Sequence, residues 1–106
     1  MNKSHAAFFG DRERTFALTP PLIAELERLT GQGIGALARK LFAGDFHLQH
    51  IAELLRLALI GGGEKPQEAA ALVDAYTNEA SIAAAYATAV DVLSAAWFGA
   101  PEEVSA

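Results

Sequence analysis

Three consecutive glycines, Gly61, Gly62 and Gly63, followed by Lys65, are the feature of this 106-residue chain that most resembles a ligand site. A phosphate-binding loop needs G-x-x-x-x-G-K-[ST] after a strand, because backbone N–H groups wrap the phosphates and a hydroxyl reaches the magnesium ion. Here the glycines follow an apolar helical run, and Pro66 stands where the hydroxyl is needed. The pattern therefore predicts a structural turn over Gly61, Gly62 and Gly63 with a left-handed helix end, and no cofactor.

A second candidate for chemistry is the pair His47 and His50, with Glu53 three positions further on. Zinc sites on helices use histidines at positions i and i+4, so that both rings reach one ion, and they need further ligands. The one other histidine on a different segment is His5, which falls in an N-terminal stretch that we expect to be flexible. Histidines at the start of a surface helix explain the pair better, so we predict no metal site.

Catalytic machinery has no other candidate in the sequence. The chain has no cysteine, which excludes thiol catalysis, disulfide bonds and cysteine-based metal sites. No serine or threonine stands in a nucleophile elbow, and no pair of carboxylates differs from ordinary charges on helix surfaces. We therefore predict that the protein is not an enzyme.

Charge is distributed unevenly along a chain whose net charge is −5. All eight Lys and Arg residues lie within residues 1–65, whereas residues 66–106 carry only acidic charge. This distribution argues against nucleic acid as a partner and favours a basic protein or a simple solvated surface. The longest uncharged stretch in the C-terminal part, residues 80–90, is far below the roughly 18 residues that a membrane-spanning helix needs. We expect a soluble cytoplasmic protein.

The elements that position these residues are predicted to be mainly α-helical. We expect one small domain over residues 1–106, built from about five helices and a short N-terminal β-hairpin, with flexible tails at residues 1–5 and 100–106. Aromatic residues on both sides of Gly10 and Asp11 predict a hairpin over residues 6–18. Thr19 before two prolines predicts a helix start at about residue 20, with the threonine as its cap.

Apolar spacing and glycine stops predict the remaining helices. The first ends at Gly31, and the second, over residues 34–43, buries four apolar side chains and ends at Gly44. The buried set is Ile34, Leu37, Leu41 and Phe42. Asp45 is predicted to cap a third helix that is apolar around much of its circumference and forms the centre of the core. Pro66 opens a fourth helix, and whether it breaks from the fifth at Asn78 stays open.

The last helix carries large residues in a regular stripe and several alanines elsewhere. The stripe consists of Ile82, Tyr86, Val90, Leu93 and Trp97. Its spacing predicts that these side chains are buried, either in the subunit or in a symmetric oligomer, while the alanines let another helix approach closely. Phe98 falls off the stripe, so we interpret it as an exposed anchor for a partner.

The order of these features resembles the small tail protein family of gene transfer agents and related phages, often described as tail assembly chaperones. The resemblance covers about residues 8–99. Its motifs are "FGDRERTFALT", "LIAELERLTG", "GALARKLFAGDFHLQHIAELLRLALIGGGEKPQEAAALVDAY" and "LSAAWFG". The strongest parts are residues 57–63 and the terminal "AAWFG". None of these motifs is catalytic, so the resemblance implies a role and a fold without a reaction.

Such a resemblance implies a chaperone in the bacterial host cell that keeps the long helical tape measure protein from aggregating and yields to the tail tube protein during assembly. Homo-oligomer formation stays open. We expect the partner to dock across the fourth and fifth helices, on residues Phe98, Trp97, Glu68, Asp74 and Asp91. The alternatives are a structural tail component that remains in the particle and a small helical regulatory or interaction protein.

Overall fold

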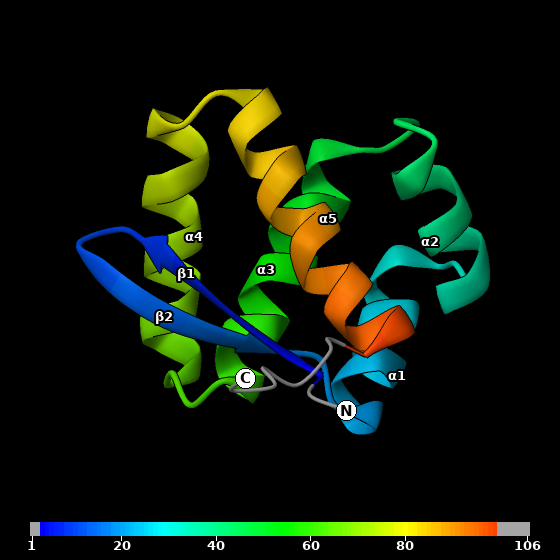
Figure 1. The fold of residues 1–106 in the computed structure, drawn as a ribbon, viewed down its shortest axis with the longest axis horizontal. Coiled ribbons are helices and arrows are strands. Elements are labelled where there is room, and N and C mark those ends of the chain that lie inside the picture. The colour runs from blue at the N-terminus through cyan, green and yellow to red at the C-terminus, as the bar shows by residue number, and fades with distance from the viewer. Residues whose placement is uncertain (1–2, 100–106) are drawn as a thin grey trace, which may run out of the picture.

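A computed structural model of the chain describes residues 3–99 (Figure 1). Within that range a two-stranded hairpin precedes five helices: β1 Ser4–Phe9, β2 Arg12–Ala17, α1 Pro20–Thr30, α2 Ile34–Phe42, α3 Leu48–Gly61, α4 Pro66–Glu79 and α5 Ile82–Phe98. The predicted mainly helical fold with an N-terminal hairpin is confirmed. The expected C-terminal tail, residues 100–106, and residues 1–2 lie outside the described residues.

The hairpin is longer than its sequence pattern indicates. β1 and β2 pair antiparallel, and Gly10 and Asp11 form the two-residue turn between them. Gly10 has a φ of 73°, which fits a type II′ hairpin turn with glycine at its first central position. Ser4 and His5, which were expected in a flexible tail, pair with β2 instead. Alternate side chains of β1 face the helices, and this burial supports the strand as far as Ser4.

The helices begin and end at the predicted prolines and glycines, but the side-chain caps predicted at Thr19 and Asp45 do not form. α1 begins at Pro20 and stops at Gly31, which has a φ of 70° and donates its N–H to the backbone carbonyl oxygen of Glu27. The side chain of Thr19 makes no capping hydrogen bond. Asp45 does not cap α3; its N–H lies at the end of α2 and donates to the carbonyl oxygen of Lys40 at 2.8 Å. The N-cap position of α3 is taken by the following His47.

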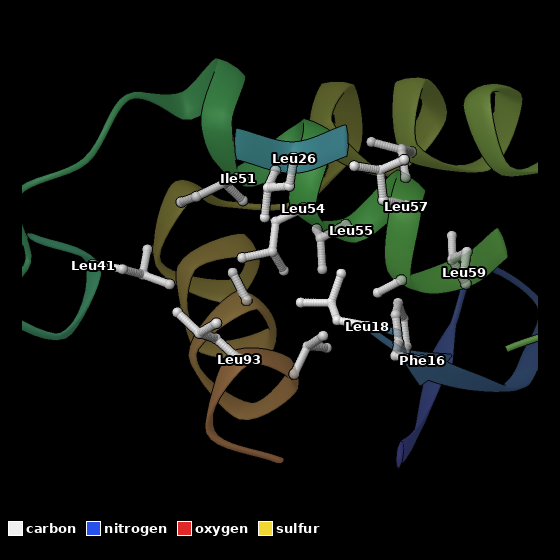
Figure 2. Packing of buried hydrophobic residues seen from close by; sticks show 14 of the residues in the cluster. Phe16, Leu18, Leu26, Leu41, Ile51, Leu54, Leu55, Leu57, Leu59 and Leu93 are labelled. Atoms are coloured by element: carbon white, nitrogen blue, oxygen red, sulfur yellow. The ribbon is translucent and has the colours of Figure 1, made fainter. Parts of the chain in front are cut away.

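α3 is the central helix, as its largely apolar circumference predicts. It packs against β2 and three other helices, and Figure 1 shows it in the middle of the fold, between α4 on one side and α1 and α2 on the other. Figure 2 shows its leucines meeting side chains from α1, α2, α5 and the hairpin in one cluster. A fully buried leucine contributes about 1.5–3 kcal/mol to stability. The six buried residues of α3 are Ile51, Leu54, Leu55, Leu57, Ala58 and Leu59.

α4 and α5 are separate helices. The break falls at Ala80, whose ψ of 156° is extended, and the Oγ of Ser81 then caps α5 by accepting a hydrogen bond from the N–H of Ala84 at 3.1 Å. α4 turns Val73 into the core, and Tyr76 stacks on Phe9 of the hairpin with ring centroids 4.1 Å apart. The apolar side of α4 therefore faces the core and the hairpin.

Within the subunit the predicted stripe of α5 is not buried at its two ends, and its burial in a symmetric oligomer stays a prediction. Ile82 is 59% exposed and Trp97 is 49% exposed, whereas Leu93 is fully buried. The buried face is instead built largely from small residues: Ala85, Ala89, Val92, Leu93 and Ala95. Alanines lie inside because α3 and the hairpin pack against this face of α5, and small side chains allow the close approach.

Candidate partner-binding surface

The first two of the three glycines lie where the end of α3 meets the hairpin. Gly61 is the last residue of α3, and a Cβ atom placed on it would overlap the carbonyl oxygen of Ala17. A Cβ atom on Gly62 would overlap the carbonyl oxygen of Thr15 in the same way. The predicted left-handed helix end is confirmed at the third glycine, since Gly63 has a φ of 115° and donates its N–H to the carbonyl oxygen of Ile60, whereas Gly62 has a φ of −84°. At the first two positions glycine is needed for close backbone approach.

A buried charge network holds the same hairpin to the loop after the glycines. The guanidinium of Arg14 donates to Glu64 Oε1 at 2.6 Å, to Asp11 Oδ1 at 2.8 Å and to the carbonyl oxygen of Phe9 at 3.0 Å. Burial alone would lower the pKa of Arg14, but the hydrogen bonds to the two carboxylates raise it. The hydrogen bond from Arg14 lowers the pKa of Asp11. Sequence reasoning missed this network; the signal was Arg14 on the same strand face as buried Phe16.

The histidine pair lies at the start of α3 beside a small pocket. The rings of His47 and His50 have centroids 4.8 Å apart, and both line the pocket together with Gln32, whose Oε1 is buried without a hydrogen-bond partner in the described chain. Burial lowers the pKa of His50, and the neighbouring His47 and Lys40 lower it further. No group of three metal-ligating side chains occurs among residues 3–99.

The end of α5 gathers exposed aromatic side chains beside an apolar groove. Phe98 is 64% exposed, and its ring lies 6.3 Å from that of Phe42, which is 39% exposed and not buried as α2 spacing predicts. Trp97 lies on the edge of a groove whose other walls come from α1, α2 and α5. The groove is lined by Ile23, Ile34, Leu93, Ala96 and Trp97. We call these five residues, with Phe42 and Phe98, the α5-end surface.

The predicted acidic residues do not surround this surface. Glu68 lies in the first turn of α4 beside Arg12 and Arg14, Asp74 is exposed on α4, and Asp91 lies 3.9 Å from the imidazole of His5 in β1. Among the described residues, no hydrogen bond or ion pair links any two of these three carboxylates, so they form no common cluster. Because α5 packs against β1, the hairpin occupies part of the α4 and α5 surface that we predicted for the partner.

None of the helices in the described range has the length and hydropathy needed to span a bilayer. Comparison with curated proteins and with solved structures found no match. One family model, described as phage tail tube protein GTA-gp10, matches residues 2–99 of the sequence. Since the match covers nearly the whole chain, this protein belongs to that family of gene transfer agent and phage tail proteins.

Proposed function

We propose that this tail protein is an assembly chaperone that binds the tape measure protein in the cytoplasm of the bacterial host before the tail tube closes around it. The observation that carries the proposal is the α5-end surface, where Trp97 and Phe98 stand exposed beside an apolar groove between three helices. A small domain rarely exposes neighbouring large aromatic side chains without a binding role. The protein would act by binding and not by catalysis.

A groove of this kind suits an apolar helix face. Ile23 and Ile34 come from two different helices and Leu93 forms the floor from a third, so a helix could lay residues of one face between them. Trp97 and Phe98 at the rim would supply the largest apolar contacts, as aromatic anchors usually do. The net charge of −5 would keep the complex dispersed and favour a basic client.

A structural component that remains in the particle is the second candidate. It is favoured by the family description, which names a tail tube protein. Both roles agree with membership of a tail family better than a general regulatory protein does. The two differ in one outcome, because a chaperone leaves the assembled tail and a component remains in it.

Co-expression with the tape measure protein of the same gene cluster tests the chaperone role. We expect the tape measure protein to become soluble and to co-purify with this chain. A Trp97→Ser, Phe98→Ser double variant should lose both effects, whereas Phe8→Ser, which removes another exposed aromatic at the far end of α5, should retain them.

Mass spectrometry of purified particles separates the two tail roles. A chaperone should be absent from tails that contain the tube and tape measure proteins in normal amounts. Stoichiometric amounts of this chain in washed particles would instead establish it as a structural component. A tape measure protein that is equally soluble without this chain would refute the chaperone proposal.

A further inference from the structure

The small pocket at the start of α3 has an apolar floor. Its most buried lining residues are four side chains from α2 and α3: Leu37, Leu41, Ile51 and Leu54. Figure 2 shows Leu41 and Ile51 at the edge of the core cluster. A floor of this kind accepts a branched aliphatic group, because the apolar atoms of that group leave water when they enter it.

Three basic side chains lie on the polar side of the pocket. Lys40 is in the last turn of α2, His47 is the N-cap residue of α3, and His50 follows in the first turn of α3. The two histidine rings have centroids 4.8 Å apart, and burial together with the charges of His47 and Lys40 lowers the pKa of His50. The first turn of α3 has no acidic residue, so the positive end of the helix dipole adds to this potential. This side of the pocket therefore favours an anionic group.

Hydrogen-bond acceptors lie in the same pocket. Gln32 Oε1 is buried and accepts no hydrogen bond from the described part of the chain. An unpaired buried acceptor is costly, so a ligand that donates an N–H group to it removes that cost. Asp45 adds an exposed carboxylate to the lining. The pocket therefore offers basic groups for a carboxylate, acceptors for a nitrogen donor and an apolar floor for a side chain.

We propose that this pocket binds an α-amino acid unit that has a branched aliphatic side chain, such as leucine. Its carboxylate pairs with Lys40 and the two histidines, its α-nitrogen donates to Gln32, and its side chain lies on the apolar floor. The unit is the same in a free amino acid and in the last residue of a protein chain. A free amino acid also has an ammonium group for Asp45, whereas a chain end has one amide N–H for Gln32.

The pocket lies apart from the end of α5, so ligand binding here is independent of the proposed client site. Phe46, another residue of the lining, stacks on Tyr86 with ring centroids 4.8 Å apart. Tyr86 is about 20 Å along α5 from Gly99. Replacement of Trp97 and Phe98 should therefore leave ligand binding in the pocket unchanged.

Nuclear magnetic resonance titration of the full chain tests the pocket with two probes, free leucine and the peptide acetyl-Gly-Gly-Leu. At least one of them should bind with a dissociation constant of about 1 mM or less, shift the ring signals of His47 and His50, and raise the pKa of His50. Tighter binding of leucine identifies a free amino acid as the ligand, and tighter binding of the peptide identifies a chain end. Isocaproate, which is leucine without its α-nitrogen, should bind at least about tenfold more weakly than the better probe.

Lys40→Gln should weaken binding of the better probe by about tenfold, because this variant removes a charge from the pocket. Arg39→Gln is the matched control, since Arg39 is an exposed neighbour on α2 outside the pocket lining, and this variant should bind normally. Both replaced side chains are exposed, so both variants should keep the fold. The proposal is overturned if neither probe binds at about 10 mM, if isocaproate binds as well as the better probe, or if the two variants behave alike.

Discussion

Nη1 of Arg14 in β2 lies 2.6 Å from Oε1 of Glu64, the residue directly after the three glycines, and both side chains are largely buried. This ion pair joins residues 50 positions apart and ties the hairpin to the end of α3. Removing Glu64 leaves the buried Arg14 with one carboxylate partner, Asp11, whose side chain is exposed, and the loss of a partner from a buried charge is costly even where the intact pair contributes little. The hairpin and the loop after α3 are therefore one structural unit.

Glu64→Gln should lower the free energy of unfolding by about 1–3 kcal/mol, because the buried Arg14 loses one of its two carboxylate partners. Glu25→Gln is the matched control, since Glu25 pairs with Arg28 on an exposed surface of α1 and its loss should cost less than about 0.5 kcal/mol. Urea unfolding of both variants measures the difference. Equal effects would mean that the Arg14 pair is solvated in solution.

Gly61→Ala and Gly62→Ala should each destabilise the fold by about 3 kcal/mol or more, because the added methyl group meets a backbone carbonyl that cannot rotate away. Gly35→Ala in α2 provides the contrast. Its methyl group would meet no atom within 4 Å, so the substitution should stabilise the protein by about 0.5–1 kcal/mol. Thermal unfolding of the three variants checks the order.

The sequence predicts the elements well because their signals are local. The Gly-Asp turn, the prolines at the starts of α1 and α4 and the glycine after α1 each act within a few residues. The contacts that fix the hairpin are not local, since Arg14 with Glu64 and Thr15 with Gly62 join distant segments. Period and propensity carry no information about such pairs, so the sequence predicts the left-handed turn at the glycines but not the close approach of Gly61 and Gly62 to the hairpin.

The sequence also predicts the wrong buried face of α5 within the subunit, for a different reason. Choosing the stripe by its largest residues assumes that large side chains go inside. An alanine-rich helix offers an alternative face, and here Ala85 and Ala89 are buried, which leaves Trp97 half exposed at the end of the helix. The same choice places Trp97 in the buried stripe as well as among the expected partner-binding residues, so the sequence does not predict the groove between α1, α2 and α5.

Trp97→Ala should cost only about 1–2 kcal/mol, less than the loss expected for a core tryptophan. Leu93→Ala, a fully buried position on the same helix, should cost about 2–5 kcal/mol. Tryptophan fluorescence gives an independent check, because Trp97 is the one tryptophan of the chain. Its emission should be red-shifted and quenched by acrylamide; a blue-shifted, protected emission would place Trp97 in an interface or in the core.

Acidification should destabilise the protein through His50. Burial lowers the pKa of this histidine in the folded state below its unfolded value of 6.5, so the unfolded chain binds more protons. The contribution is fully present above that value and is lost as the pH falls through the folded pKa. His50→Gln should therefore reduce the fall in the urea midpoint between pH 7.5 and pH 5.

The binding kinetics of the tape measure protein should distinguish two candidate surfaces: the α5-end surface and the acidic surface of α4 and α5. If the client docks on the α5-end surface, Phe98→Ala should mainly speed its dissociation, since a buried aromatic contact is lost at a stage after encounter. Reversing the charge of Glu68, Asp74 or Asp91 to lysine should slow association and reduce its salt dependence, because these residues lie away from the groove and act through long-range attraction. Surface plasmon resonance with the purified client measures both rates. If Asp91→Lys speeds dissociation as much as Phe98→Ala does, the client contacts the surface of α4 and α5 directly, and the groove between α1, α2 and α5 is not its main binding site.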